Sequence, residues 1–63
     1  MKKVKAKETY IENGTTQVYL YANKEYNIYS EFLTEKMFSG KCYVILCEDD
    51  EFRGLDSNYF DEI

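Results

Sequence analysis

The sequence predicts a mainly β fold in one small domain covering residues 1–63. Apolar and polar residues alternate in several short segments, as they do in strands that have one face in water. Seven Tyr and four Phe occur in 63 residues. Aromatic side chains favour strands and bury large areas. This aromatic content argues against disorder, although 32% of the residues are charged.

Short polar breaks divide the chain into five predicted strands. These are residues 1–10, 17–21, 26–32, 41–47 and 52–55. In the first strand, lysines fall on one side while Val4 and Ala6 fall on the other. Asn13-Gly14 tolerates the positive φ angles of a tight hairpin, so the first and second strands should form one. Residues 61–63 are a candidate for a last short strand.

The segment 41–47 is the clearest strand. Five consecutive apolar residues, Cys42 to Leu46, indicate that both faces are covered and that the strand is central. Cys42 and Cys47 are five residues apart, so their side chains should point to opposite faces, about 16 Å from one another. A disulfide cannot span that distance. We interpret both thiols as buried, small apolar groups in a reducing compartment.

Two connections have distinct patterns. Residues 32–40 are compatible with a short helix closed by Gly40, or with an extended loop, and we expect a loop carrying one helical turn. Residues 56–60 resemble a single tight turn whose free N–H groups are capped by Asp56 or Ser57.

Alternation along the strands also predicts the core, in which one face of each strand is buried. On the third strand, Tyr26, Ile28, Ser30 and Phe32 should share a face. The predicted core residues are Val4, Val18, Leu20, Tyr26, Ile28, Val44, Leu46, Leu55 and Phe60.

Charge is unevenly distributed along the chain. Residues 1–47 carry a balance of +2 and residues 48–63 a balance of −6, which gives the net charge of −4. A net acidic chain is a poor candidate for direct nucleic-acid binding, because that affinity comes mainly from Lys and Arg. No apolar run is long enough to span a membrane, and no secretory signal opens the chain, so we expect a cytoplasmic protein.

The residue types needed for most catalytic and metal sites are missing. The chain has no His, only two Cys and three isolated Gly. A nucleophilic Cys or Ser therefore has no imidazole base, zinc has too few ligands, and no glycine-rich phosphate loop occurs. The acidic run 48–51 lacks the spacing of a calcium-binding loop. We therefore predict a protein that is not an enzyme and that uses no cofactor and no metal.

Several short pieces of the chain resemble small SH3-like proteins of Gram-positive bacteria and their phages. The matching pieces are Val4-Lys5-Ala6, Lys24-Glu25-Tyr26-Asn27-Ile28, Tyr43-Val44-Ile45, Glu48-Asp49-Asp50 and Tyr59-Phe60. The resemblance implies a small five-stranded SH3-like barrel, of phage or prophage origin, in the cytoplasm of a bacterial host cell. It implies no particular activity, since such barrels serve many unrelated functions.

Two functions from different classes remain. The first is a protein-binding module that uses loops and exposed tyrosines, because Tyr is enriched at interfaces. Its candidate residues are Tyr19, Tyr21, Tyr29 and Tyr43. The second is an inhibitor of a host DNA- or RNA-binding or defence protein, in which acidic residues mimic nucleic acid and bind a basic partner. Its candidate residues are Glu48, Asp49, Asp50, Glu51, Asp56, Asp61 and Glu62. A homodimer is a further candidate, since a small open barrel has edges to cover.

Overall fold

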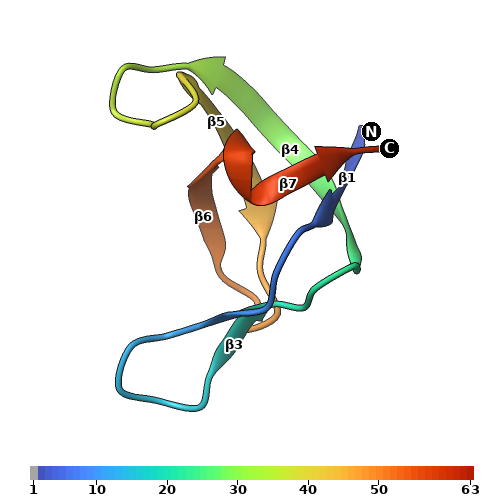
Figure 1. The fold of residues 1–63 in the computed structure, drawn as a ribbon, viewed down its shortest axis with the longest axis vertical. Coiled ribbons are helices and arrows are strands. Elements are labelled where there is room, and N and C mark those ends of the chain that lie inside the picture. The colour runs from blue at the N-terminus through green and yellow to red at the C-terminus, as the bar shows by residue number, and fades with distance from the viewer. Residues whose placement is uncertain (1) are drawn as a thin grey trace.

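The computed structural model describes residues 2–63, which form short strands and one turn of 3₁₀-helix (Figure 1). The elements are β1 (Lys3–Ala6), β2 (Tyr10–Ile11), β3 (Val18–Leu20), β4 (Glu25–Leu33), β5 (Lys41–Leu46), β6 (Phe52–Asp56), η1 (Ser57–Tyr59) and β7 (Phe60–Glu62). The prediction of a mainly β fold is confirmed. The single strand predicted over residues 1–10 is instead two strands, and Met1 lies outside the described residues.

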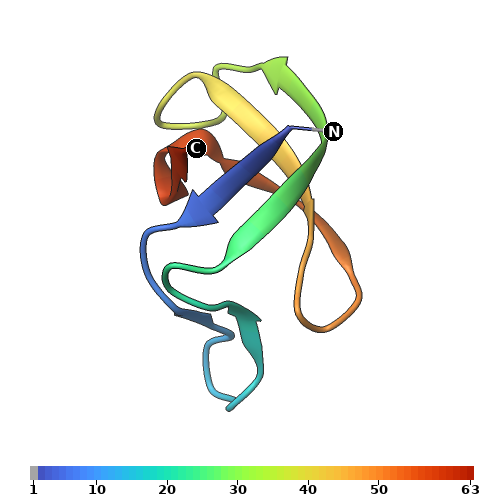
Figure 2. The ribbon, with the colours of Figure 1, turned by 90° about the vertical axis from the view of Figure 1, so that its right-hand side faces the viewer.

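Five strands form one antiparallel sheet in the order β6-β5-β4-β1-β7, and β2 pairs with β3 in a separate hairpin. The hairpin and the turn between β5 and β6 project from the same end of the molecule (Figure 2). The connection between β4 and β5 lies at the opposite end. Two loops that are distant in sequence therefore share one end of the sheet.

A β-bulge in β4 changes which side chains face the core. Ile28 pairs with Ile45 but Ser30 pairs with Val44, so β4 contains one extra residue at this point. An extra residue reverses the alternation of every side chain beyond it. Tyr26 and Ile28 are buried, whereas Ser30 and Phe32 are exposed on the opposite, outer face. The prediction that all four residues share one face is therefore wrong beyond the bulge.

The core lies on the inner face of the sheet. Its buried residues are Val4, Ala6, Leu20, Tyr26, Ile28, Tyr43, Ile45, Cys47 and Phe60. Five predicted members are confirmed: Val4, Leu20, Tyr26, Ile28 and Phe60. Four others, Val18, Val44, Leu46 and Leu55, are only half-buried.

On β5 the prediction was wrong about the phase of the strand, that is, about which alternate side chains face the core. Ile45 pairs with buried Ile28, which directs Tyr43, Ile45 and Cys47 inward and leaves Val44 and Leu46 on the outer face. An uninterrupted apolar run contains no alternation from which this phase could be predicted. The two thiols are free and buried, as predicted for Cys42 and Cys47.

The turns follow local backbone chemistry. Gly14 in the β2–β3 hairpin and Gly40 before β5 both have positive φ, near 78° and 79°, a conformation that glycine adopts at low cost. The helical turn predicted within residues 32–40 is not formed. β4 extends to Leu33, and residues 34–40 form successive turns. The helical turn of the chain is η1, which is capped by Asp56 accepting a hydrogen bond from the backbone N–H of Asn58. No helix in the described part of the chain has the length and hydropathy needed to cross a membrane.

Candidate functional site

A groove of about 660 Å³ lies between the β2–β3 hairpin and the turn from β5 to β6. Polar residues 15–17 of the hairpin form one side. Three carboxylates, those of Glu12, Glu48 and Asp49, line it together with Tyr21. Tyr21 is 48% exposed, so its ring is accessible. The groove thus combines an aromatic ring with acidic groups from two separate parts of the chain.

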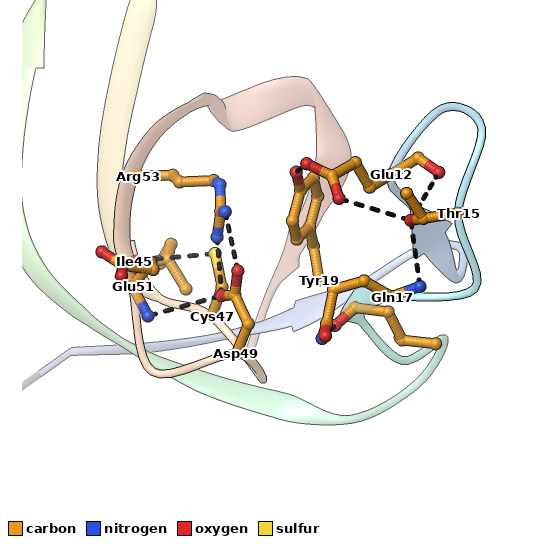
Figure 3. A network of polar contacts seen from close by, with 10 residues as sticks. Glu12, Thr15, Gln17, Tyr19, Ile45, Cys47, Asp49, Glu51 and Arg53 are labelled. Carbon is orange, nitrogen blue, oxygen red and sulfur yellow. Dashed lines mark hydrogen bonds and ion pairs between the residues drawn. The ribbon is translucent and has the colours of Figure 1, made fainter.

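Arg53 on β6 holds the acidic turn against β3 (Figure 3). Its two terminal nitrogens donate hydrogen bonds of 2.7 Å to the two oxygens of Asp49. Its guanidinium carbon lies 3.7 Å from the centre of the Tyr19 ring, a cation–π contact. The hydrogen bonds from Arg53 lower the pKa of Asp49, and the same pairing raises the pKa of Arg53. Asp49 therefore stays ionised to a lower pH than an unpaired carboxylate does.

Tyr19 extends this cluster into the hairpin. Its hydroxyl donates a 2.8 Å hydrogen bond to Glu12, and this bond is the main reason why the pKa of Tyr19 is raised. Thr15 donates to the backbone oxygen of Glu12 and accepts from the N–H of Gln17. Figure 3 shows the hydrogen bonds of Arg53 with Asp49 and those that link Tyr19, Glu12, Thr15 and Gln17, and the contact of Arg53 with the Tyr19 ring joins the two groups. The hairpin wall of the groove is thereby fixed relative to the turn.

Glu48 is held from the other side of the groove. It accepts hydrogen bonds from the Lys24 ammonium at 2.7 Å and from the Tyr26 hydroxyl at 2.6 Å. The hydrogen bond from Lys24, followed by that from Tyr26, lowers the pKa of Glu48. Burial and the contact with Glu48 raise the pKa of Tyr26. The Tyr26 hydroxyl also accepts a hydrogen bond from the backbone N–H of Tyr21, which positions the start of the segment after β3.

The groove and its rim carry a net negative charge. Asp50 and Glu51 are exposed on the same turn as Glu48 and Asp49. Together with Glu12 they make five carboxylates against two cations, Lys24 and Arg53, a balance of −3. Oxygen Oε1 of Glu48 receives no hydrogen bond from the described residues. A carboxylate offers about four acceptor sites, so these groups retain capacity for a further donor.

The predicted acidic residues do not all lie in this region. Asp56 is buried at 8% exposure, where it accepts hydrogen bonds from the backbone N–H groups of Ser39 and Asn58. Asp61 and Glu62 lie on β7, which pairs with the lysine-rich β1. They form ion pairs of 3.9 Å with Lys7 and 3.6 Å with Lys2. The seven acids therefore do not form a single row, because strand pairing places the last two beside lysines.

The predicted tyrosines are also divided. Tyr43 is 2% exposed and belongs to the core, so its prediction as a surface residue is wrong; the phase of β5 directs it inward. Tyr29 lies on the outer face in an edge-to-face contact with Phe52, with 5.1 Å between ring centres. Tyr19 is half-buried in the Arg53 cluster, and Tyr21 alone among the four lines the groove.

Sequence reasoning missed Glu12, Lys24 and Arg53 as members of this region. Glu12 and Lys24 lie in polar turns, where a charged residue carries no signal of its own. Arg53 is the only Arg in the chain. A single guanidinium four residues after an Asp is compatible with a bidentate pair, but only the turn of β5 into β6 brings the two together.

The buried thiols are not activated: burial raises the pKa of Cys47 more than Arg53 lowers it. Burial raises the pKa of Cys42 and of Cys47, whereas reactive thiols have lowered values. Within residues 2–63, no three His, Cys, Asp or Glu side chains are close enough together to hold a metal ion.

Comparison with protein-family models, with curated proteins and with solved structures finds no match for this chain.

Proposed function

We propose that this protein is a non-catalytic protein-binding module and that its partner inserts a basic segment into the groove between the β2–β3 hairpin and the β5–β6 turn. The observation that carries this proposal is that Tyr21 and three carboxylates from two parts of the chain line the same groove. It joins the two functions considered from the sequence, since aromatic and acidic groups contribute to one surface.

The chemistry of the groove favours a Lys or Arg side chain. A cation near Tyr21 gains a cation–π contact, and the surrounding carboxylates accept its N–H groups. Individual exposed ion pairs contribute only about 0.2–1 kcal/mol each. Several such contacts would therefore be needed, and the partner should carry more than one basic residue. Attraction of this kind accelerates association and weakens as salt is added.

The groove is also pre-organised. Arg53 fixes Asp49, Lys24 fixes Glu48, and Tyr19 fixes Glu12. Groups that are held in place before binding lose less conformational entropy when the partner arrives. The buried thiols and the absence of His from the sequence support a binding function over a catalytic one.

As part of this proposal, the fold is a small SH3-like barrel. The features that support it are the antiparallel five-stranded sheet, the acidic turn between β5 and β6, and the helical turn that leads into β7 at Phe60. These features correspond to the pieces on which the resemblance to small bacterial and phage SH3-like proteins depends. A bacterial or phage setting for the partner is part of the same proposal.

The proposal is tested by a nuclear magnetic resonance titration with a short Lys- and Arg-rich peptide as the probe. Shifts should concentrate at Tyr21, at residues 12–17 and at residues 48–51, and they should shrink as salt is added. Glu12→Lys should weaken binding, whereas Glu35→Lys should not. Both reverse one exposed carboxylate, but Glu35 lies in the connection between β4 and β5 at the other end of the molecule.

A second measurement uses the natural partner. Proteins retained from a bacterial lysate by the wild-type chain should also be retained by Glu35→Lys, and they should be lost with Glu12→Lys and with Tyr21→Ser. Equal retention by all four chains, or peptide shifts spread evenly over the surface, would contradict the assignment of the groove.

A further inference from the structure

The two edges of the five-stranded sheet differ in how they are protected. β7 is three residues long and carries Asp61 and Glu62, whose charges discourage strand addition. β6 is five residues long and pairs with β5 over its whole length without a bulge, and no strand of residues 2–63 pairs with its other side. Its one cation, Arg53, is drawn inward by Asp49. β6 therefore lacks the usual devices that prevent another strand from pairing with it.

An apolar surface lies along this open edge. Phe52 is 57% exposed at the start of β6, and its ring contacts that of Tyr29. Phe52 pairs with the half-buried Leu46 on the outer face. Two positions further along β6, Gly54 leaves that face without a side chain. The edge thus combines backbone groups that pair with no other strand, an exposed ring and a glycine whose place on the outer face is partly taken by the sulfur of Cys42.

We propose that two copies of this chain pair in antiparallel orientation along β6, around a twofold axis at Gly54, and so form a continuous ten-stranded sheet. This inference concerns a surface other than the groove and goes beyond the proposed function. A second copy fits this edge because the strand is complementary to itself in one register.

The register follows from side-chain direction and charge. A twofold axis perpendicular to the sheet keeps each face on its own side, so a residue must lie opposite its own copy at the axis. An axis at Arg53 would place two guanidinium groups opposite one another, which is unfavourable. An axis at Leu55 would require pairing by residues 57–58, which belong to η1. An axis at Gly54 uses all five strand residues and places no like charges opposite one another.

The same register matches shapes at the edge. Phe52 becomes a diagonal neighbour of the partner's Gly54, a separation that aromatic side chains can span. Each exposed ring can then lie over Gly54 of the other copy, as aromatic rings do over edge glycines in designed sheets. Arg53 lies opposite the partner's Leu55, so its charge meets no other charge. Because two five-residue strands make a small interface, the dimer should be weak and dependent on concentration.

Sedimentation equilibrium up to about 1 mM, the Kd range of weak complexes, tests the proposal. The average mass should rise from 7.5 kDa toward twice that value. Phe52→Lys should weaken association at least about tenfold. Phe38→Lys is the matched control, because it makes the same exchange at a residue that is 93% exposed in the connection between β4 and β5. The average mass of this variant should rise with protein concentration as that of the wild type does.

Amide hydrogen exchange of the wild-type chain gives a readout that needs no variant. Protection of amides in β6 should increase with protein concentration, while that of amides in β7 should not. A chain that stays at 7.5 kDa throughout would overturn the proposal. So would a dimer that protects β7 instead of β6, or one that Phe38→Lys disrupts as strongly as Phe52→Lys does.

Discussion

The two faces of β5 carry similar side chains but have different surroundings. On the inner face, Tyr43 and Ile45 are 2% and 0% exposed and pack within the core. On the outer face, Val44 and Leu46 are half-buried, with Tyr29, Phe32 and Phe52 exposed around them. Apolar composition alone therefore does not identify the buried face of a strand. The outer face has the composition of a core, but beyond Cys42, which is 1% exposed, no second layer of the described chain covers it.

Replacing Ile45 and Val44 separately by Ala should give the largest contrast between the two faces. Ile45→Ala removes fully buried methyl groups and should cost about 2–4 kcal/mol of unfolding free energy. Val44→Ala removes half-buried groups and should cost less than about 1 kcal/mol. Urea denaturation, monitored by tyrosine fluorescence at low protein concentration, measures both values.

Ile28→Ala is the control for this contrast, because Ile28 pairs with Ile45 on the inner face and is 6% exposed. It should resemble Ile45→Ala. If Val44→Ala proved as costly as Ile45→Ala, the phase of β5 described here would be incorrect, and the outer face would be covered in solution.

The buried face of a strand could be predicted from the sequence where apolar and polar residues alternate, but not where the residues are uniformly apolar. Val4 and Ala6 alternate with lysines, so the buried face of β1 was predicted correctly. In β5 every position after Lys41 is apolar, so its phase is decided by pairing with β4, and that pairing depends on the bulge before Ser30. No residue type in β4 marks the bulge, since Tyr29 and Ser30 are ordinary strand residues.

The candidate groove shows the same limit. The acidic turn and the exposed Tyr21 were predicted as separate surfaces, but their meeting depends on the hairpin and the turn lying at one end of the sheet. The proximity of these two surfaces results from the order of the strands in the sheet, which local sequence patterns do not encode. Asp61 and Glu62 illustrate the converse. They are near the β5–β6 turn in sequence, but the pairing of β7 with β1 places them away from it.

Gly54 provides a smaller test of how closely the outer face is packed. A Cβ atom at this position would lie 2.9 Å from the sulfur of Cys42. Gly54→Ala should therefore cost about 1–3 kcal/mol as an overpacked contact. Cys42→Ala should relieve it, so the double variant should be less destabilised than the sum of the two single variants. Additive effects in a urea-denaturation cycle would contradict this contact.

Asp56 marks the one end of the outer face that is closed, and it supplies a test through pH. The connection between β4 and β5 folds over this end, where Ser39 donates its backbone N–H to Asp56. Hydrogen bonds from Ser39, and then from the N–H of Asn58, lower the pKa of Asp56. A folded-state pKa below the unfolded value contributes stability above about pH 3.9, the unfolded pKa of Asp. That contribution is lost as the pH falls through the folded value.

Asp56→Asn should therefore lower the thermal midpoint at pH 7 by roughly 5 °C, the effect expected from weakening one hydrogen bond to a charged group in a domain of this size. The difference from the wild type should narrow as the pH falls below about 4, because the carboxylate is then protonated in the unfolded wild-type chain, and it should be smallest once the folded carboxylate is protonated as well. Asp50→Asn makes the same exchange at an exposed residue of the β5–β6 turn and controls for the loss of one negative charge. A difference between wild type and Asp56→Asn that stayed constant from pH 7 to pH 2 would mean that the carboxylate charge does not hold this connection against the sheet, and the outer face would then be open at both ends.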